Sequence, residues 1–372
     1  MIYCLPGTPF LCQFVDKIST ISDKKDNTDF KYILTNKLKV IPEGFHFSDK
    51  SVLILSRSED YEADLIGIEL LRKGIDYVRL NIEDITHSLN ITCSIESKSN
   101  PECQINIGST NIKTSDIAVV LFRDFTHQLS SFDGIDLKSV FMYQQWSDAL
   151  QVLYSRLKCS WINTPNATQR ASNRICQLIS AKDVGFDIPS TLITNDPKMA
   201  NNFYHVNNGN IILKVLHHHD IEMRNKSYSI YSHQATESDL LRFSDLAYAP
   251  CILQEKLKKQ SELRVTVVGD QVFAAEIKTG SLAEVQDDIH RFQLSQFSKK
   301  SVELKREDKS RCIRMIKSLG LNYGAIDFLI TENGKLNFLE INPTGDWMWI
   351  ERQTKLPVTK AVVDLIKKMG SY

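Results

Sequence analysis

The chain has 372 residues, of which 42% are hydrophobic, and its 45 basic and 45 acidic side chains give a formal net charge of zero. A chain of this length can bury a sizeable core and is expected to form two or three lobes. Neutrality argues against a nucleic-acid partner, and no apolar run approaches the roughly 18 residues of a membrane-spanning helix. We therefore expect a soluble protein with neither nucleic acid nor membrane as a partner.

The eight cysteines form no CxxC pair and no spacing typical of a zinc site. Reduced thiols are the simpler interpretation, and they are typical of a cytoplasmic protein. The N-terminus also lacks the basic segment and long apolar stretch of a secretory signal. Residues 1–50 precede any clear structural pattern, so we assign them to an N-terminal extension of unknown role.

From Ser51 the chain alternates between apolar runs and an amphipathic stretch, which predicts an α/β unit. Arg123 follows an apolar run, where its guanidinium could bind an acidic group of a substrate bidentately. Pairing with Asp124 or another local acid is the alternative. The expected elements are a strand at Val52–Leu55, a helix at Tyr61–Lys73, strands at Tyr77–Leu80 and Ile117–Phe122, and a helix from about Val140 to Leu157.

A second lobe is expected to begin near Thr164, where a proline-asparagine turn precedes a helix that Gly185 ends. The next strand, Ile211–Val215, contains Lys214 in an apolar run, and a buried lysine is costly unless an anion such as phosphate meets it. A strand-edge lysine that reaches water through its flexible stem is the alternative. The polar stretch that follows, HHHDIEMRNKSYS, has the composition of a mobile loop.

The strand predicted at Cys251–Leu253 is followed directly by a segment that could bind the edge of an adenine ring. The segment consists of Gln254, Glu255, Lys256 and Leu257. Next, RVTVVGDQVFAAEI predicts a hairpin with its turn at Gly269-Asp270. Alternation along its first strand places Glu262, Arg264 and Thr266 on one face. A carboxylate suits ribose hydroxyls and a guanidinium suits phosphoryl oxygens. Taken alone, each charge would be interpreted as an ordinary solvated charge.

The strongest pattern is a second hairpin, AIDFLIT and KLNFLEIN, with Asn333-Gly334 as its predicted two-residue turn. This turn would place Asp327 directly opposite Glu340, with Asn342 on the same face. Like charges that face each other on a sheet repel, so a cation between them is expected. Hard oxygen donors suit Mg²⁺, and a solvated face is the alternative. The opposite face is predicted to be core and contains Ile326, Phe328, Ile330, Leu339 and Ile341.

Lys214 on a strand, the LQEKL segment, Glu262 and the hairpin carboxylates together resemble the ATP-grasp ligases. Longer stretches resemble the ATP-grasp ribosomal peptide maturases, which are the ligases of microviridin-type and grasp-with-spasm peptides (graspetides). These stretches are TPNATQRASNRICQLISAKDVGFDIPSTLITND, SELRVTVVGDQVFAAEI and FLEINPTGDWMWIERQTKLPV. The resemblance covers roughly residues 51–372.

The fold class that this resemblance implies is α/β with α+β lobes. An N-terminal pre-ATP-grasp α/β domain (51–163) would precede an ATP-grasp fold with a central lobe (164–253) and a C-terminal lobe (254–372). The cofactors would be ATP and Mg²⁺.

The resemblance also implies roles for individual residues. Lys214 would contact the ATP phosphates, and Arg264 would steady the transferring phosphoryl group or the acyl phosphate. The segment from Gln254 to Leu257 would line the adenine, and Glu262 would hold the ribose. The metal ligands would be Asp327, Glu340 and Asn342.

Two departures from the family pattern affect these roles. Asn173-Arg174 replaces the usual Asn-Lys pair. This change keeps a positive charge for phosphate but replaces an ammonium group by a planar guanidinium. The loop after Lys214 has no glycine-rich stretch and instead carries His217, His218 and His219, so backbone cradling of the phosphates is in doubt. We expect this loop to close over nucleotide or to touch substrate. Substrate contacts are expected from Arg123, His217 and Arg291.

The implied activity is an ATP-dependent carboxylate–amine or carboxylate–alcohol ligase. It would activate Asp or Glu side chains of a ribosomal precursor peptide as acyl phosphates and close ester or amide macrocycles. The precursor, with its leader segment, would be the partner, and related maturases suggest a homodimer. One alternative is a ligase that adds a free amino acid to a peptide or protein terminus. Another is an ATP-binding regulatory protein that has lost turnover.

Overall fold

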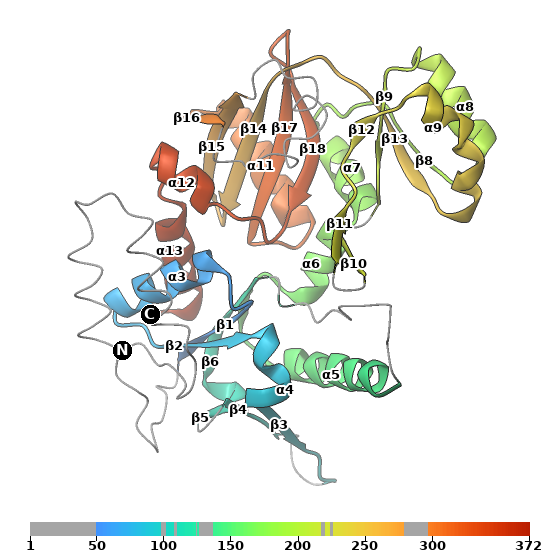
Figure 1. Cartoon of the computed structure of the whole chain (residues 1–372). Helices are drawn as coiled ribbons and strands as arrows, with labels where there is room; N and C mark the ends of the chain where they lie inside the picture. Colours follow the sequence, from blue (N-terminus) through green and yellow to red (C-terminus); the bar gives the residue numbers. More distant parts are fainter. Residues whose placement is uncertain are drawn as a thin grey trace. The chain divides into compact units, whose positions relative to one another are not determined.

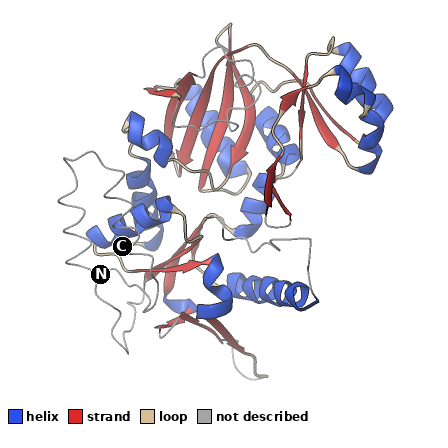
Figure 2. Cartoon of the chain, viewed as in Figure 1, coloured by secondary structure: helices blue, strands red, loops and turns tan. Residues whose placement is uncertain are grey.

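The computed structural model describes residues 50–97, 102–107, 110–123, 125, 137–216, 220–223, 226–278 and 297–372. The described residues form two compact units (Figures 1 and 2). Unit 1 contains the described residues up to 125 together with 141–162 and 362–372, and unit 2 contains 137–140 and 163–361. Except for Lys50, the predicted N-terminal extension lies outside the described residues.

Unit 1 is built on a four-stranded parallel sheet with the order β2-β1-β6-β7. All six residues of β1 are buried, as expected for a parallel strand that is covered on both faces. Helix α3 (Tyr61–Arg72) connects β1 to β2, and Asp60 caps it by accepting a hydrogen bond from the Ala63 N–H at 3.0 Å. The predicted α/β unit is therefore confirmed. The strands are β1 (Ser51–Ser56), β2 (Tyr77–Asn81), β6 (Ile117–Phe122) and β7 (Ser160–Ile162).

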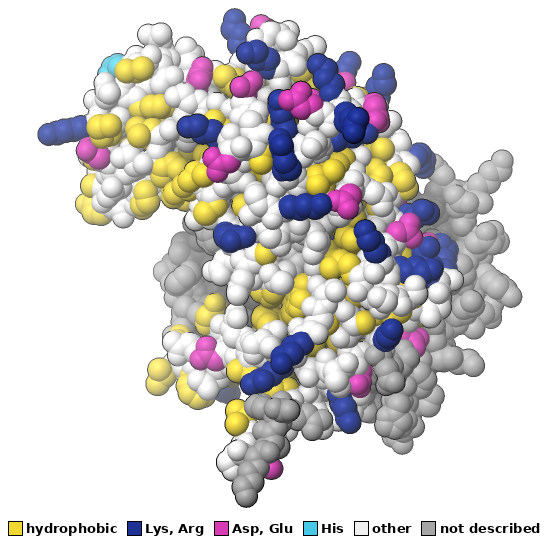
Figure 3. Space-filling view, turned by 180° about the vertical axis from the view of Figure 1, so that it is seen from behind, with side chains coloured by type: hydrophobic (Ala, Val, Ile, Leu, Met, Phe, Trp, Pro, Cys, Tyr) yellow, Lys and Arg dark blue, Asp and Glu magenta, His cyan; other side chains and the backbone are white. Residues whose placement is uncertain are grey.

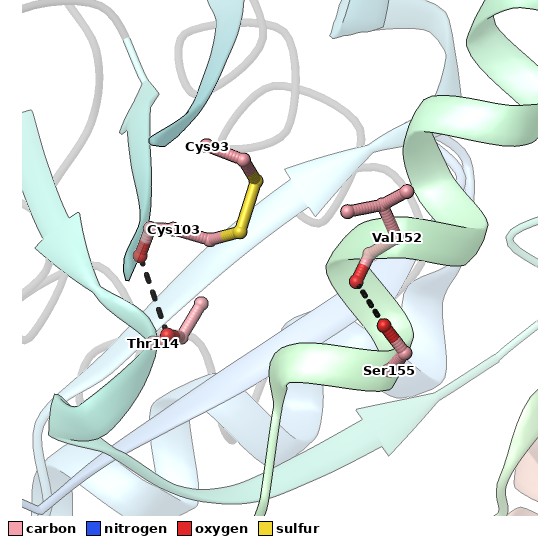
Figure 4. The surroundings of a disulfide bond; sticks show 5 residues. All are labelled: Cys93, Cys103, Thr114, Val152 and Ser155. Atoms are coloured by element: carbon pink, nitrogen blue, oxygen red, sulfur yellow. Dashed lines mark hydrogen bonds between the residues drawn. A yellow bond between two sulfur atoms is a disulfide. The ribbon is translucent and has the colours of Figure 1, made fainter. Parts of the chain in front are cut away.

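A small three-stranded sheet in unit 1 contains a disulfide bond (Figure 4). Cys93 and Cys103 face each other across an antiparallel strand pair, with their Cα atoms 4.2 Å apart. The expectation of reduced thiols was wrong for this pair. Two cysteines with a sequence separation of 10 form no motif, and only the strand register brings them together. The strands are β3 (Leu89–Ser94), β4 (Glu102–Ile107) and β5 (Thr110–Lys113).

The end of the chain belongs to unit 1, although the sequence assigned it to the C-terminal lobe. Helix α13 (Val358–Gly370) begins in unit 2. Its last turns lie in unit 1, where Lys73 Nζ is 3.3 Å from the Asp364 carboxylate and Ser160 Oγ donates to the Met369 carbonyl at 3.4 Å. The other described α-helices that include residues of unit 1 are α4 (Ile85–Ser88) and α5 (Leu137–Arg156).

In unit 2, a four-stranded antiparallel sheet has the order β12-β9-β13-β8. Ala200 from α8 and Phe243 from a short 3-10 helix pack against Ile211 and Leu253 of this sheet. The elements are β8 (Thr191–Thr194), β9 (Ile211–Lys214), β12 (His233–Gln234), β13 (Cys251–Glu255), α8 (Pro197–Val206) and α9 (Glu237–Leu241).

The polar stretch after Lys214 was predicted to be a mobile loop, and this prediction was wrong for most of it. Strands β10 (Asp220–Met223) and β11 (Lys226–Ser229) form an antiparallel pair. Both strands are mainly polar, so their sequence lacks the apolar alternation that identifies a strand. His217 and its two neighbours lie outside the described residues.

The segment that follows Thr164 contains two helices rather than one. The Pro-Asn pair forms the first turn of α6 (Pro165–Ser172), and Asn173 then caps α7 (Arg174–Asp183). The Asn173 side chain accepts hydrogen bonds from the N–H groups of Ile175 and Cys176 at 3.0 and 3.1 Å. Because Asn173 is extended, α7 starts at Arg174 in a new direction.

The largest sheet has five antiparallel strands in the order β16-β15-β14-β17-β18. One face packs against α11 (Arg306–Ser318), α6 and α7 (Figure 1), and this core includes Leu263, Val265, Phe328 and Ile341. The strands are β14 (Lys259–Val268), β15 (Gln271–Lys278), β16 (Ser298–Val302), β17 (Tyr323–Thr331) and β18 (Leu336–Asn342). Helix α12 (Met348–Thr354) follows β18.

The β17–β18 hairpin has the predicted pairing but not the predicted turn. Gly334 has a φ of +75° and the Thr331 N–H donates to the Lys335 carbonyl at 3.1 Å, so the loop contains three residues. This loop alone would misalign the carboxylates by one residue. A β-bulge between Asp327 and Phe328 restores the register, so Asp327 pairs with Glu340.

The bulge also changes which β18 residues enter the core. Phe338 is fully buried there, whereas Leu339 is only half-buried and lies outside the core cluster, so the prediction for Leu339 was wrong. The core positions of Ile326, Phe328 and Ile341 are confirmed.

In the part of the chain that the structure describes, no helix combines the length and the apolar character needed to cross a bilayer. Figure 3 shows Lys and Arg side chains interspersed with acidic and apolar ones on one face of the protein. This mixture agrees with the zero net charge.

Candidate ATP and metal site

A row of buried charged residues lies on the face of the five-stranded sheet that is turned away from α11. Leu263 and Val265 point into the core, so the alternate residues Glu262, Arg264 and Thr266 share the other face, as predicted. β14 is the central strand, and Arg264 is only 5% exposed. These side chains are therefore not ordinary solvated charges, and each needs a polar partner.

Arg264 is held by the first of the two opposed carboxylates. Its Nη1 donates to Asp327 Oδ2 at 2.6 Å, and Nη2 donates to the Asp346 carbonyl at 3.4 Å. Among the described residues, the buried Nε has no hydrogen-bond partner. Burial by itself would lower the pKa of Arg264, but the charges of Asp327 and Glu340 raise it above its ordinary value. The guanidinium thus stays charged, and its Nε–H donates to none of the described residues.

The loop after β18 covers Arg264 closely, and Gly345 makes this possible. A Cβ at Gly345 would lie 2.6 Å from Arg264 Nη2 and 3.0 Å from the Ala325 Cβ. We expect Gly345→Ala to displace the guanidinium from Asp327 and to lower any phosphoryl-transfer activity by about tenfold.

Gly324→Ala is the matched control, because its Cβ would lie 2.6 Å from Ile316 Cδ1 on the core side. Both variants should lower the melting temperature, but only Gly345→Ala should lower turnover. Equal turnover in both would mean that the close approach to Arg264 has no role in the site.

The second carboxylate, Glu340, also meets an arginine. Arg174 Nη1, in the first turn of α7, is 3.1 Å from Glu340 Oε2. Asn342 is exposed, and its Oδ1 accepts from the Thr344 N–H at 3.0 Å. Asp327, Glu340 and Asn342 thus lie on neighbouring strands of one sheet, and each acid has a cationic neighbour.

These two arginines provide the positive charge that the sequence attributed to Mg²⁺ alone. The donor set still fits Mg²⁺, because two carboxylates and one amide supply hard oxygen atoms and leave positions for water and phosphate. Among the described residues no group of three or more His, Cys, Asp and Glu side chains is placed to hold a metal. The present set contains only two acids, so its metal role stays a prediction.

The predicted adenine segment lies at the end of β13, next to β8 and β9. Gln254 and Glu255 still belong to the strand, so the strand ends later than predicted. The backbone N–H groups of Glu255 and Lys256 donate to the carbonyls of Ser190 and Asn210 at 2.8 and 2.9 Å. Lys214, at the end of β9, pairs with Ile252 of β13 and is half-buried. Leu257 follows the strand and is also half-buried.

Glu262, the predicted ribose ligand, pairs with a lysine that the sequence did not single out. Lys259 Nζ is 2.7 Å from Glu262 Oε1, and the lysine side chain is 3% exposed. The register shift between Lys259 and Ser261 allows this contact within one strand. Side chains alternate along a regular strand, so residues three positions apart are expected on opposite faces. The sequence pattern therefore could not predict this pair, which depends on the bulge.

Two buried amides were also missed by sequence reasoning. Asn163 is 1% exposed and binds the backbone of Tyr323 and Pro343, with Nδ2 distances of 2.9 and 3.0 Å. Gln177 binds the backbone of Ile341 from α7. Asn and Gln in polar segments give no signal of such roles, because only the fold brings these strand residues to them.

Arg123 is buried in unit 1 beside local acids, which is the alternative that the sequence left open. Its Nε donates to Asp60 Oδ2 at 2.7 Å, and Nη2 is 3.8 Å from Glu62. Burial raises the pKa of Asp60, but Arg123 and the hydrogen bonds around the carboxylate outweigh it, so the net shift is downward. The other acid named as a possible partner, Asp124, lies outside the described residues, as do His217 and Arg291.

This buried pair predicts a pH-dependent contribution to stability. We expect Asp60→Asn to lower the free energy of unfolding by about 3 kcal/mol near neutral pH, because Arg123 loses its counter-charge. The folded-state pKa of Asp60 lies below its ordinary value of 3.8. Its contribution is therefore present above that value and is lost as the pH falls through the folded-state pKa.

Urea unfolding at several pH values measures this difference. The difference in free energy of unfolding between wild type and Asp60→Asn should be constant from about pH 8 to 5 and should become smaller in more acid solution. The exposed neighbour variant Glu59→Gln is the control. A gap that widens toward acid pH would contradict the assignment.

Parts of the sequence and the fold are similar to those of known proteins. Residues 184–366 match the family described as the RimK-like ATP-grasp domain. A probable alpha-L-glutamate ligase of Vibrio atlanticus is 24% identical over 274 residues, which cover 72% of this chain and 84% of that protein. A protein of the same name from Picosynechococcus is 30% identical over 139 residues, which cover 37% of this chain and 44% of that protein.

Solved structures with the same fold cover most of the chain. A RiPP-associated ATP-grasp ligase of Chryseobacterium gregarium, in complex with ADP and a leader and core peptide, has a TM-score of 0.75 at 21% identity and covers 86% of this chain and 97% of its own. The macrocyclase MdnB of Microcystis aeruginosa has a TM-score of 0.71 at 26% identity, and the match covers 85% of this chain and 99% of MdnB. MdnC from the same organism, bound with precursor peptide MdnA, has a TM-score of 0.74 at 23% identity, and the match covers 86% of this chain and 99% of MdnC.

The chain therefore contains a RimK-like ATP-grasp domain over residues 184–366. Its fold is the predicted ATP-grasp fold, in the α/β class. The solved structures of similar fold are described as a RiPP-associated ligase and two macrocyclases, and the curated relatives are described as probable alpha-L-glutamate ligases.

Proposed function

We propose that this protein is an ADP-forming ligase that activates Asp or Glu side chains of a ribosomal precursor peptide and closes macrocycles. The observation that carries the proposal is the sheet face on which Asp327 and Glu340 oppose each other beside the buried Arg264. Such a face suits a charged triphosphate better than an apolar ligand, because its groups are ionic and already oriented.

The reaction would proceed in two steps. A carboxylate oxygen of the peptide attacks the γ-phosphorus of ATP, the bond to the ADP oxygen breaks, and an acyl phosphate forms. A Ser or Thr hydroxyl, or a Lys amine, then attacks the acyl carbon and loses its proton, and inorganic phosphate leaves. Positioning and electrostatics can supply most of this rate, so no protein nucleophile is required.

The charge of each residue determines which part of Mg²⁺–ATP it would bind. Lys214 and Arg174 would bind ATP phosphates, and the unused Nε of Arg264 would bind the transferring phosphoryl group or the acyl phosphate. Glu262 would hold the ribose, and the segment from Gln254 to Leu257 would bind the adenine. Asp327, Glu340 and Asn342 would hold Mg²⁺, which offsets phosphate charge when it is bound.

The substrate class rests on the structural neighbours. Those from Chryseobacterium and Microcystis are described with a leader and core peptide or a precursor peptide. We infer a precursor peptide with a leader segment as the partner here. A homodimer and a cytoplasmic location stay predictions. Reductants of the cytoplasm would oppose the Cys93–Cys103 bond, so its oxidation state in intact cells tests the location.

A second candidate function is favoured by the curated relatives. Their names describe them as probable alpha-L-glutamate ligases, which corresponds to a ligase that adds a free amino acid to a peptide or protein terminus. It would share every nucleotide residue named above, but the activated acid would be a terminal carboxylate and the nucleophile would be the amine of a free amino acid. An ATP-binding regulatory protein without turnover is the third possibility, and the presence of all three predicted metal ligands argues against it.

Mass spectrometry separates these functions. The purified chain is incubated with ATP, Mg²⁺ and a short peptide encoded beside its gene that is rich in Thr, Ser, Asp, Glu or Lys. Macrocyclisation should lower the peptide mass by one water per ring, with one ADP released for each ring. A gain of one amino-acid residue when free glutamate is present would support the second function. ATP binding without any mass change would support the third.

A further inference from the structure

Gln177 makes an unusual set of contacts between α7 and the edge strand β18. Its side chain is 3% exposed, and Nε2 donates to the Ile341 carbonyl at 2.9 Å and to the Ala171 carbonyl at 2.7 Å. Its Oε1 accepts from the Ile341 N–H at 3.2 Å. One amide therefore binds both backbone groups of Ile341, as a neighbouring strand would.

The position of Ile341 gives this contact its importance. β18 is at the edge of the sheet and contains the bulge that aligns Glu340 with Asp327. Ile341 lies between Glu340 and Asn342, so its backbone sets the direction of both neighbouring side chains. Before the bulge, the Phe338 N–H donates to the Asp187 carbonyl at 2.8 Å. After the bulge, Gln177 supplies the corresponding support from α7.

Arg174 on the same helix cannot provide that support continuously. It contacts Glu340 through side chains only, at 3.1 Å. If Glu340 binds a metal and Arg174 a phosphate, as proposed above, this contact has to open. The Gln177 contacts involve the backbone of Ile341, so they need not change when Glu340 and Arg174 exchange partners.

We propose that Gln177 is a positioning residue that fixes the backbone of Ile341 so that Glu340 and Asn342 keep the orientation needed for Mg²⁺-bound nucleotide. The inference rests on the proposed function, because it assumes that these two side chains are metal ligands. Residues that support metal ligands without touching the metal typically change metal affinity by 10- to 100-fold.

Ser180 provides a matched control on the same helix. Its Oγ lies 2.6 Å from Ser318 Oγ, so Ser180→Ala removes a buried contact between α7 and α11 without touching β18. Gln177→Met removes the hydrogen bonds to β18 and keeps the side-chain length. A purely structural role of Gln177 would make the two variants alike in everything except their loss of stability.

The test measures binding of ADP by calorimetry, with and without Mg²⁺, together with amide hydrogen exchange of residues 336–342. Gln177→Met should weaken Mg²⁺-dependent ADP binding at least tenfold and accelerate exchange in this segment. Metal-free ADP binding should be the same in wild type and both variants. Ser180→Ala should stay within about twofold of wild type in both measurements.

Wild-type binding of Mg²⁺–ADP by Gln177→Met would overturn the proposal. If wild type itself shows no Mg²⁺-dependent binding, the proposed function fails instead, and the two failures are distinguishable. If Gln177→Met does not fold, Gln177→Glu keeps the shape and the acceptor for the Ile341 N–H but removes both donated bonds. Unchanged Mg²⁺–ADP binding by Gln177→Glu would likewise overturn the proposal.

Discussion

Glu340→Gln and Asp327→Asn should each abolish ADP release while leaving the protein folded. Each variant replaces one carboxylate of an opposed pair by an amide of nearly the same shape. It removes a charged oxygen donor that Mg²⁺ favours, and with it the means to offset phosphate charge. We expect at least a hundredfold loss in a coupled assay of ADP release.

Glu332→Gln is the control for these substitutions, because Glu332 is exposed at the loop of the same hairpin. It should release ADP at the wild-type rate. Circular dichroism and thermal unfolding establish that each variant is folded. Undiminished ADP release by both Glu340→Gln and Asp327→Asn would refute the metal assignment.

Arg264→Lys should have the second-largest effect, although it conserves charge. The guanidinium binds Asp327 and Asp346 with two nitrogens and keeps Nε for another acceptor. A lysine ammonium cannot present donors in this fork geometry. We expect turnover to fall by about a hundredfold, whereas binding of Mg²⁺–ADP should change by only a few-fold because the positive charge remains.

Arg311→Lys makes the same chemical change on the surface of α11, where Arg311 pairs with Glu307 and Asp308 of its own helix. Its turnover should equal that of wild type. If Arg264→Lys retained full turnover, the role of the guanidinium in phosphoryl transfer would be wrong. If it lost nucleotide binding altogether, Arg264 would be a binding residue.

The sequence predicted the β17–β18 hairpin because alternation and Asn333-Gly334 are local signals. It reached the pairing of Asp327 with Glu340 from a turn that the structure does not contain. The three-residue loop and the bulge offset each other in register. Neither could be predicted, because a bulge depends on how Phe338 and Ile341 fill the core against α7 and α11.

Residues that act across long sequence distances were beyond sequence reasoning. Gln177 is 164 positions from Ile341, and Asn163 is 160 from Tyr323. Lys259 and Glu262 are close in sequence, but their contact requires a bulge in β14. The Cys93–Cys103 bond likewise depends on strand register. By contrast, the shared face of Glu262, Arg264 and Thr266 follows from strand periodicity alone.

The arginines change how the opposed carboxylates should be interpreted. Repulsion between Asp327 and Glu340 was the reason to expect a cation, yet Arg264 and Arg174 each neutralise one of them. The same arginines also suit a site that alternates between an ion-paired state and a state with metal and phosphate bound. In that second state, Glu340 would bind the metal and Arg174 the phosphate.

Calorimetric titration of the wild-type chain with ADP, in buffer with Mg²⁺ and in buffer with a chelator, tests the central claim most directly. If Asp327, Glu340 and Asn342 hold Mg²⁺ against the nucleotide phosphates, ADP will bind at least tenfold more tightly with the metal, and Glu340→Gln will remove that difference. Equal affinity in the two buffers, or a metal effect that survives in Glu340→Gln, would contradict the claim.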